Sequence, residues 1–392
     1  MKNKLIIILT TVLVGLQIQA QEIVLPFKLY ENKYVLLKLP VENRKDSLTF
    51  YFDTGASSTL LDKTIAKKFN ITPNNTTNIQ GASGNKSYEL ALNQKIQLTK
   101  EHAIDSVSII LEDLSRLNSA FSSSFDGIIG NDIIKNYITK IDFDKREIHL
   151  YKKKTVLDTK DYTEIPFTFK NNIEIPQFPI SIELTNGEKL SGDILFDSGA
   201  GLSLLINTPF QKKHDILKKS GKYYSITTDN LSDKTVTIVS KVKKVAIGNF
   251  TFKSLPFLIA SDKEGVSSFD GYLGILGSEI INRFNIILDY DTHKLYLKPN
   301  SLYNNKFEIN VNPLKLKKSA DEIIISSVVK NSVAEKAGLK AGQKIIAING
   351  ISTTDINSYN KELNKENKKV TIEYLDDKGK SKKVKIRLKK LI

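Results

Sequence analysis

Two short segments of the chain could hold a pair of carboxyl groups side by side. They are Asp53-Thr54-Gly55 and Asp197-Ser198-Gly199, and each follows an apolar run that ends in Phe. Two carboxylates about 3 Å apart do not both ionise readily, so they share one proton. The ionised member can then act as a general base on water while the protonated member donates to a carbonyl. This chemistry could hydrolyse an amide without a covalent intermediate.

A single triplet of this kind is more often a simple turn, because Asp caps the bend and Gly tolerates a positive φ. An internal repeat argues for more than a turn. Asp53 and Asp197 are 144 residues apart, and Phe125-Asp126-Gly127 returns as Phe269-Asp270-Gly271 at the same spacing. Each copy then continues into an apolar-apolar-Gly element, Ile128-Ile129-Gly130 or Ile275-Leu276-Gly277. A period this long indicates duplicated lobes and not a solenoid.

The elements that must position the two triplets are mostly strands. Short β-branched and aromatic runs alternate with turn residues. The expected strands are Leu48–Phe52, Lys140–Asp144, Glu147–Tyr151, Phe284–Tyr290 and Lys294–Lys298. The pattern indicates few helices, and we expect them at Lys63–Phe69, Asp132–Tyr137 and Ser278–Phe284.

With these motifs the chain resembles the pepsin and retropepsin class of aspartic peptidases, and within it bacterial retropepsin-like proteins that carry a C-terminal PDZ domain. The resemblance runs from about residue 25 to residue 392. It implies a mostly β fold in which two duplicated acid-protease lobes form a single-chain pseudo-dimer, followed by a small α+β PDZ-like domain. The expected boundaries are residues 21–155 and 156–300 for the lobes and 301–392 for linker and PDZ-like domain.

The resemblance also implies a role for each loop residue. Asp53 and Asp197 would be the catalytic pair. The loop-support residues would be Thr54, Gly55, Ser57, Ser198 and Gly199, through hydroxyl hydrogen bonds and backbone amides. One position breaks the repeat: Ser57 follows Ala56, whereas Gly201 follows Ala200. The two aspartates should therefore have unequal surroundings.

A hairpin flap would cover the bound substrate in this class. The candidate residues are Gly81, Ala82, Ser83, Gly84 and Tyr88, since two glycines at this spacing permit a mobile tip. An ordinary hairpin turn explains the same residues equally well. The second lobe has no glycine in the corresponding stretch, residues 227–234.

The last 92 residues have a different pattern of expected strands and helices from that of the lobes. A polar stretch at residues 298–306 suggests a linker. The segments Ile323–Val329, Ser332–Leu339 and Lys344–Gly350 indicate a strand, a capped short helix and a strand entering a turn, and a polar helix at Asn357–Asn367 and two strands close the chain. This order resembles a bacterial PDZ domain, which binds extended peptide ends at a sheet edge. The usual Gly-rich carboxylate loop is missing, so peptide capture and a structural role both remain open.

The N-terminus is typical of a secretory signal peptide. Lys2 and Lys4 precede an apolar stretch that is too short to span a bilayer, and Ala20 offers a cleavage point. Residues 1–20 would be removed, which predicts an exported protein, periplasmic or secreted, without a transmembrane anchor.

Composition excludes several other functions. The chain has no Cys, and its four His lack metal-ligand spacing, so we expect neither a metal nor another cofactor. The net charge is +15, but it comes from dispersed Lys with five Arg, which does not indicate specific nucleic-acid binding. The expected partners are a polypeptide substrate and a peptide ligand of the PDZ-like domain. The rival hypothesis is a non-catalytic exported protein that binds peptides in a degenerate protease cleft.

Overall fold

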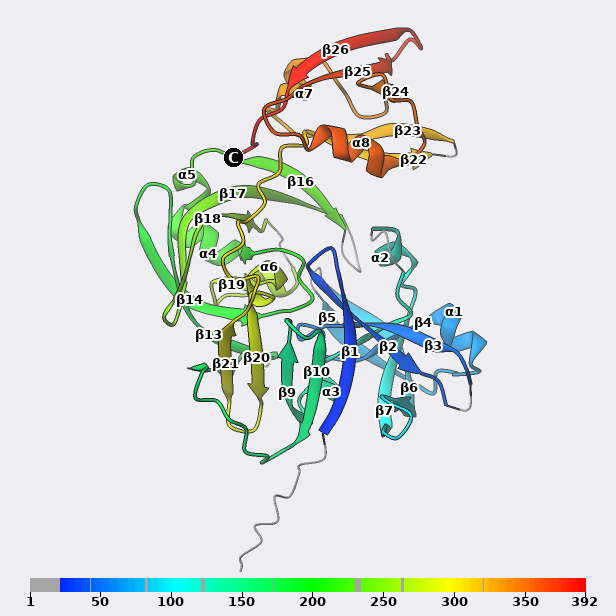
Figure 1. The fold of residues 1–392 in the computed structure, drawn as a ribbon, viewed down its shortest axis with the longest axis vertical. Coiled ribbons are helices and arrows are strands. Elements are labelled where there is room, and N and C mark those ends of the chain that lie inside the picture. Colours follow the sequence, from blue (N-terminus) through cyan, green and yellow to red (C-terminus); the bar gives the residue numbers. More distant parts are fainter. Residues whose placement is uncertain are drawn as a thin grey trace, which may run out of the picture.

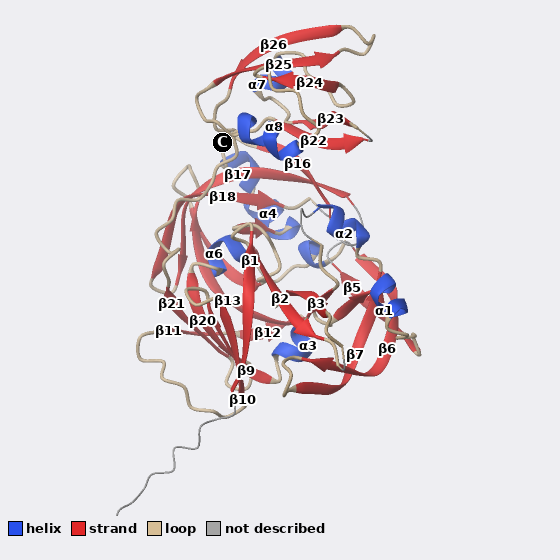
Figure 2. Cartoon of the chain, turned by 45° about the vertical axis from the view of Figure 1, so that its right-hand side comes forward, coloured by secondary structure: helices blue, strands red, loops and turns tan. Residues whose placement is uncertain are grey.

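The computed structural model describes residues 22–42, 44–81, 84–120, 124–171, 173–229, 234–261, 264–319 and 321–392. Strands account for 49% and helices for 13% of the residues, which confirms the predicted mostly β class. Two lobes and a separate C-terminal domain are visible in the ribbon, with the first lobe in blue and cyan, the second in green and yellow, and the C-terminal domain in orange and red (Figure 1). Figure 2 shows the helices as short pieces among a majority of strands.

The first lobe is built on strands whose side chains alternate between core and solvent. In β1, for example, Ile23, Leu25 and Phe27 are buried and their neighbours are exposed, as expected for a half-buried strand. The lobe contains these elements: β1 (Glu22–Tyr30), β2 (Tyr34–Pro40), β3 (Ser47–Phe52), β4 (Leu60–Asp62), α1 (Lys63–Lys68), β5 (Asn75–Gly81), β6 (Gly84–Gln97), β7 (Ala103–Glu112), α2 (Ser115–Ala120), β8 (Gly127–Ile129), α3 (Asn131–Ile134), β9 (Tyr137–Asp142) and β10 (Glu147–Lys152).

The second lobe repeats this plan. Its strand order β14-β19-β15-β18-β17-β16 matches β3-β8-β4-β7-β6-β5 of the first lobe. The lobe contains β11 (Thr163–Pro166), β12 (Thr168–Lys170), β13 (Ile173–Glu183), β14 (Lys189–Phe196), β15 (Leu204–Ile206), α4 (Thr208–His214), α5 (Ile216–Lys219), β16 (Tyr224–Asp229), β17 (Lys234–Ile247), β18 (Phe250–Ile259), the 3-10 turn η1 (Val266–Ser268), β19 (Gly274–Leu276), α6 (Ser278–Ile281), β20 (Phe284–Asp289) and β21 (Lys294–Pro299).

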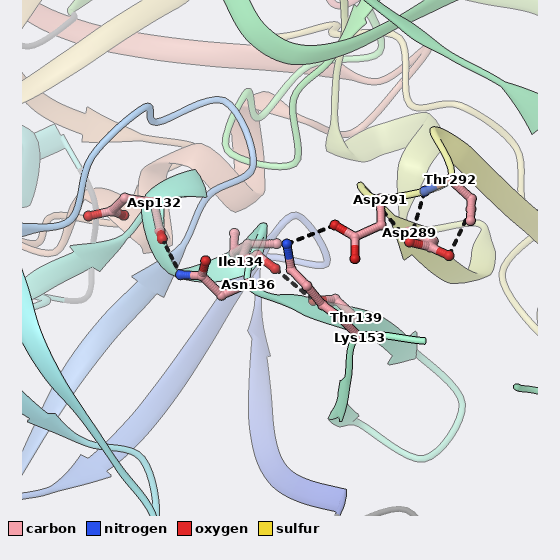
Figure 3. Close-up of polar contacts among 8 residues, drawn as sticks. All are labelled: Asp132, Ile134, Asn136, Thr139, Lys153, Asp289, Asp291 and Thr292. Atoms are coloured by element: carbon pink, nitrogen blue, oxygen red, sulfur yellow. Dashed lines mark hydrogen bonds and ion pairs between the residues drawn. The ribbon is translucent and has the colours of Figure 1, made fainter. Parts of the chain in front are cut away.

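One antiparallel sheet joins the lobes. Its strands run in the order β11-β21-β20-β9-β10-β1, and β20 of the second lobe pairs with β9 of the first through Ile286 and Ile141. At the turn end of this sheet, an ion pair at 2.7 Å links Lys153 to Asp291 (Figure 3). Because this sheet fixes one lobe against the other, it also fixes the distance between the loops that carry the two aspartates.

The C-terminal domain has its own sheet and its own core. Five strands run in chain order, and the core around Ile325, Ile348 and Leu363 is separate from the core of the lobes. The domain contains β22 (Leu314–Ser319), β23 (Glu322–Val328), α7 (Val333–Lys336), β24 (Lys344–Ile348), α8 (Ile356–Leu363), β25 (Lys369–Leu375) and β26 (Ser381–Arg387).

The connection to this domain packs more closely than its polar sequence suggested. Tyr303 and Phe307 pack against the core of the lobes. The buried Arg283 donates to the backbone carbonyls of Leu302, at 3.2 Å, and Tyr303, at 3.1 Å, and its guanidinium lies 3.8 Å from the centre of the Phe307 ring. The segment after β21 is therefore part of the second lobe's structure.

The last residues of the chain return to the second lobe. Ile392 is buried in a small apolar cluster with Tyr224 of β16 and Val239 of β17. Nearby, the Leu391 amide donates to the Asn310 carbonyl at 3.0 Å. The C-terminal domain thus contacts the β16–β17 hairpin through the last residues of the chain.

Two expected helices are shorter than the sequence pattern indicated. The segments at Asp132–Tyr137 and Ser278–Phe284 form single turns, α3 and α6, and β9 and β20 already begin at Tyr137 and Phe284. The reason is tertiary, because these apolar residues are needed by the sheet between the lobes. Likewise, the strand expected at Lys140–Asp144 ends at Asp142, where a turn begins.

Candidate active site

Each aspartate leaves its strand at the same point of the fold. β3 pairs in parallel with β8 so that Phe52 lies opposite Ile129, and the Asp53 amide donates to the Ile129 carbonyl at 3.0 Å. In the second lobe, β14 pairs in parallel with β19, and the Asp197 amide donates to the Leu276 carbonyl at 3.1 Å. The apolar-apolar-Gly elements of the sequence are therefore the strands that hold the aspartates in place.

The glycines that end these strands allow the loops to pack tightly. A Cβ atom on Gly130 would lie 2.5 Å from the Ser58 carbonyl carbon, and one on Gly277 would lie 2.5 Å from the Ala200 oxygen. The residue after each glycine is hydrogen-bonded to the aspartate loop. The Asn131 amide donates to the Ala56 carbonyl at 2.7 Å, and the Ser278 amide donates to the Ala200 carbonyl at 2.8 Å. A side chain at either glycine would push its aspartate loop away.

Backbone amides within each loop hold its carboxyl group. Asp53 Oδ1 accepts from the amides of Gly55, at 2.8 Å, and Ala56, at 3.2 Å. Asp197 Oδ1 accepts from Gly199, at 2.8 Å, and from Ala200, at 2.9 Å. The two carboxyl groups also lie close enough for each to affect the pKa of the other. The residues expected to form a pair thus share one site, with one oxygen of each fixed by its own loop.

The hydroxyl residues of the triplets join the loops across the lobe boundary. The Thr54 amide donates to Ser198 Oγ at 3.1 Å, and the Ser198 amide donates to Thr54 Oγ1 at 2.9 Å. Thr54 Oγ1 in turn donates to the Phe196 carbonyl at 3.1 Å. Both side chains are buried away from water, so these bonds satisfy polar groups that would otherwise have no partner.

The glycines of the triplets bring the loops into direct contact. A Cβ atom on Gly55 would overlap the Asp197 carboxyl group, and one on Gly199 would overlap the Asp53 carboxyl group. Each loop therefore forms part of the wall around the other loop's aspartate. Only residues without a side chain fit at these two positions.

Burial and proximity make the pair hold a proton. Loss of hydration raises the pKa of Asp53, although the loop amides and the neighbouring Asp197 carboxyl group oppose this. The pKa of Asp197 is raised well above its ordinary value, first by burial and then by the charge of Asp53. These raised pKa values favour a state in which the pair as a whole holds one proton.

Ser57 has a different position from the one that the resemblance implied. Its side chain is exposed, and none of the hydrogen bonds between described residues joins it to Asp53. The equivalent Gly201 has a steric explanation: a Cβ atom there would lie 2.6 Å from Tyr34 Cε1 and closer still to the Tyr34 hydroxyl. The break in the repeat thus makes room for a side chain of the first lobe.

The flap candidates lie at the end of the β5–β6 hairpin. Gly81 pairs with Gly84 at its tip, while Ala82 and Ser83 lie outside the described residues. Tyr88 is further down β6 and is buried in an aromatic and aliphatic cluster with Tyr51 and Phe125. The second lobe has a matching hairpin, β16–β17, which is the one that contacts the C-terminal domain.

Sequence reasoning missed three residues that reach from the first lobe to the second aspartate loop. The Tyr51 hydroxyl donates to the Gly199 carbonyl at 2.6 Å, Lys33 Nζ donates to the Gly201 carbonyl at 3.2 Å, and Tyr34 packs against Gly201. The repeat held a signal for one of them. Tyr51 aligns with Leu195, so the polar residue has no counterpart in the second copy.

A reciprocal contact links each lobe to the short helix of the other, from the turn between β1 and β2 in the first lobe and from β13 in the second. Lys33 forms an ion pair at 2.6 Å with Glu279 of α6, and Glu174 forms one at 2.5 Å with Lys135, next to α3. The sign of the charges is reversed between the two contacts. Both pairs are partly exposed, so their main effect is on the orientation of the lobes.

The described part of the chain offers neither a clustered metal site nor a membrane-spanning helix. No group of three or more His, Asp or Glu side chains there is arranged to hold a metal ion. Within the same residues, no helix has the length and apolarity needed to cross a membrane.

Comparison with known families agrees with this geometry. A family model described as aspartyl protease matches residues 39–133 and again residues 180–279, one segment in each lobe, and the segments contain Asp53 and Asp197. A PDZ domain model matches residues 324–375. No curated protein matches the chain significantly. With one protease segment in each lobe and a PDZ domain behind them, the chain belongs to the retropepsin-like aspartyl proteases with a C-terminal PDZ domain.

Proposed function

We propose that the protein is an aspartic endopeptidase whose catalytic pair is Asp53 and Asp197. The observation that carries this proposal is the closeness of the two carboxyl groups, each packed against the other's loop and with one oxygen fixed by two amides of its own loop. A purely structural pair of turns would not need two carboxyl groups in contact, since burying them together costs free energy.

The proposed reaction divides the work between the two groups. Ionised Asp53 takes a proton from water as its oxygen attacks the peptide carbonyl carbon, and Asp197 donates its proton to the carbonyl oxygen. Protonated Asp53 then gives its proton to the leaving nitrogen, the C–N bond breaks, and Asp197 recovers a proton from the hydroxyl of the intermediate. The pair ends in the state in which it began, so it needs no cofactor.

The proposed setting is outside the cytoplasm, because residues 1–20 have the pattern of a signal peptide. The substrate would be a polypeptide, and the PDZ domain would bind either that substrate or a partner peptide. The contact between the PDZ domain and the β16–β17 hairpin supports a role close to the site.

The test is cleavage of an unstructured peptide library by the purified chain without residues 1–20, with products identified by mass spectrometry. We expect cleavage by the wild type and none by Asp53→Asn or Asp197→Asn. Circular dichroism of the variants must show an intact fold. A folded wild type that binds library peptides without cutting them across pH 3 to 8 would overturn the proposal and favour a peptide-binding protein. The pH range brackets the region in which buried carboxyl pairs titrate.

A further inference from the structure

The two aspartate loops differ in the hydrogen bonds that they receive from side chains of the opposite lobe. At the second loop, the Tyr51 hydroxyl donates to the Gly199 carbonyl at 2.6 Å. Tyr51 is in β3, two residues before Asp53, so this bond runs from the strand of one aspartate to the loop of the other. Leu195, the equivalent residue of the second lobe, has no donor in its side chain.

The acceptor of this bond belongs to the peptide unit whose N–H donates to the Asp197 carboxyl group. The Gly199 carbonyl and the Ala200 amide are the two ends of one planar group, so fixing one end orients the other. That amide donates to Asp197 Oδ1 at 2.9 Å, whereas the matching Ala56 amide lies 3.2 Å from Asp53 Oδ1. A hydrogen bond accepted at the carbonyl also polarises the peptide and makes its N–H a stronger donor.

We propose that Tyr51 is a positioning residue that, through the peptide between Gly199 and Ala200, orients Asp197 and makes the two members of the proposed catalytic pair unequal. This inference rests on the proposed function for its effect on rate, although not for its effect on the titration of Asp197. The hydroxyl of Tyr51 serves as a donor at every working pH, because burial and then the charge of Asp53 raise its pKa well above the ordinary value.

Other groups around this loop act on it in different ways. Tyr34 supplies a ring that meets Tyr51 edge-on, with 5.6 Å between the ring centres, and fills the space beside Gly201. Lys33 donates to the Gly201 carbonyl, but its charge is paired with Glu279 at 2.6 Å. Asp53 faces Asp197 directly and raises its pKa. Among these groups, Tyr51 is the one that bonds to the peptide whose amide contacts Asp197.

The first experiment compares Tyr51→Phe with the wild type on one cleaved peptide across pH. The variant keeps the ring and loses the hydroxyl, so we expect kcat/KM to fall about tenfold, mostly in kcat. The weakened Ala200 amide stabilises the Asp197 anion less, which raises the upper apparent pKa of the pair. Activity requires one proton on the pair, so the alkaline limb of the profile should move to higher pH.

Tyr30→Phe is the matched control. Tyr30 packs against the same cluster of side chains as Tyr51, and its hydroxyl makes none of the hydrogen bonds to the two loops within the described residues. We expect its profile to overlay that of the wild type. If Tyr51→Phe also overlays the wild type, or loses activity with an unmoved alkaline limb, its role is absent or merely structural and the inference is wrong.

The second experiment does not depend on cleavage. The Asp197 carboxyl carbon, labelled with ¹³C and assigned with Asp197→Asn, is titrated by NMR in the wild type and in Tyr51→Phe. We expect its midpoint to move to higher pH in the variant. A shift in a protein that cuts no peptide would support the inference and refute the peptidase proposal, whereas identical titrations would overturn the inference even in an active enzyme.

Discussion

Gly55 packs directly against the carboxyl group of Asp197, so a Cβ atom at position 55 would overlap that group. The reverse contact, between Gly199 and Asp53, has the same geometry. The glycines of the triplets are therefore required by the neighbouring loop, in addition to any turn that they permit. This explains in steric terms why both copies of the triplet end in Gly.

The first prediction follows from this contact. Gly55→Ala and Gly199→Ala should each separate the loops and misplace the opposite aspartate. A displacement of about 1 Å near a reacting group costs about a hundredfold in rate. We therefore expect kcat/KM for peptide cleavage to fall by about that factor or more in both variants. Wild-type activity in either one would show that the loops separate without consequence for the pair.

The second prediction concerns stability. Folding raises the pKa of both aspartates. A carboxyl group with a raised pKa binds its proton more tightly in the folded state, so it destabilises the fold as pH rises from the unfolded pKa, about 3.9, through the folded one. Asp197→Asn cannot ionise and should therefore unfold at a higher Tm than the wild type at pH 7, with little difference at pH 3.

Thermal unfolding of Asp197→Asn and the wild type at both pH values tests this, and activity measured in parallel should be lost. An equal gain in Tm at pH 3 and pH 7 would point to a packing effect of the amide and would contradict the argument from ionisation.

The third prediction is the pH range of activity. Both loops have Ala after the triplet, so neither Ala56 nor Ala200 can offer the aspartates a side-chain hydroxyl donor. Backbone amides take that place, and burial still leaves both pKa values raised. Activity needs one proton on the pair, so it is highest between the two apparent pKa values, and because both are raised we expect an optimum at about pH 5 to 7, well above the pepsin range.

A pH–rate profile of the wild type beside Ala200→Thr checks this. The added hydroxyl should stabilise the anion and move the alkaline limb to lower pH. A wild-type optimum below pH 4, or an alkaline shift in the variant, would contradict the prediction.

The sequence was sufficient to predict the paired loops because the duplication repeats local chemistry. The triplets, the strands before them and the glycines after β8 and β19 all recur at nearly one spacing, so Asp53 and Asp197 could be paired without a structure. The same symmetry concealed the contacts that cross between lobes. Tyr51 bonds to a carbonyl 148 residues away, and no local pattern encodes that partner.

The helix boundaries also could not be predicted from local sequence patterns. The sequence pattern of Asp132–Tyr137 is compatible with a helix. Tyr137 nevertheless begins β9, because this strand is part of the sheet that joins the lobes. The linker is a similar case: Tyr303 and Phe307 are two aromatic residues within or next to a polar stretch, and only the position of Arg283 shows what they pack against. Tertiary contacts, not local propensity, decided both segments.

The fourth prediction tests the explanation for Gly201. Gly201→Ala should clash with the ring and hydroxyl of Tyr34 and destabilise the fold by about 1–3 kcal/mol, as overpacking of a tight site commonly does. In a Tyr34→Leu background the clashing ring atoms are gone, so the same change should cost much less. Denaturant unfolding of the four proteins gives the coupling energy. Additive effects would mean that Tyr34 does not determine the glycine.

The last prediction concerns where the second lobe ends. Arg283 is buried, and its guanidinium donates to carbonyls of the segment after β21 and lies against Phe307. A chain cut after residue 308 keeps these partners, whereas a chain cut after residue 300 loses them and exposes the apolar surface on which Tyr303 and Phe307 pack. Loss of a buried aromatic side chain commonly costs about 3–5 kcal/mol.

We therefore expect the chain of residues 21–308 to fold as two lobes, because the PDZ domain has its own core. It should unfold at a lower temperature than the full chain, since Tyr224 and Val239 lose the cover of Ile392. The chain of residues 21–300 should be far less stable or insoluble. Calorimetry of the three proteins measures the order. Equal stability of the two shortened chains would place the end of the lobe at β21, because the contacts of Arg283, Tyr303 and Phe307 would then contribute nothing to the fold.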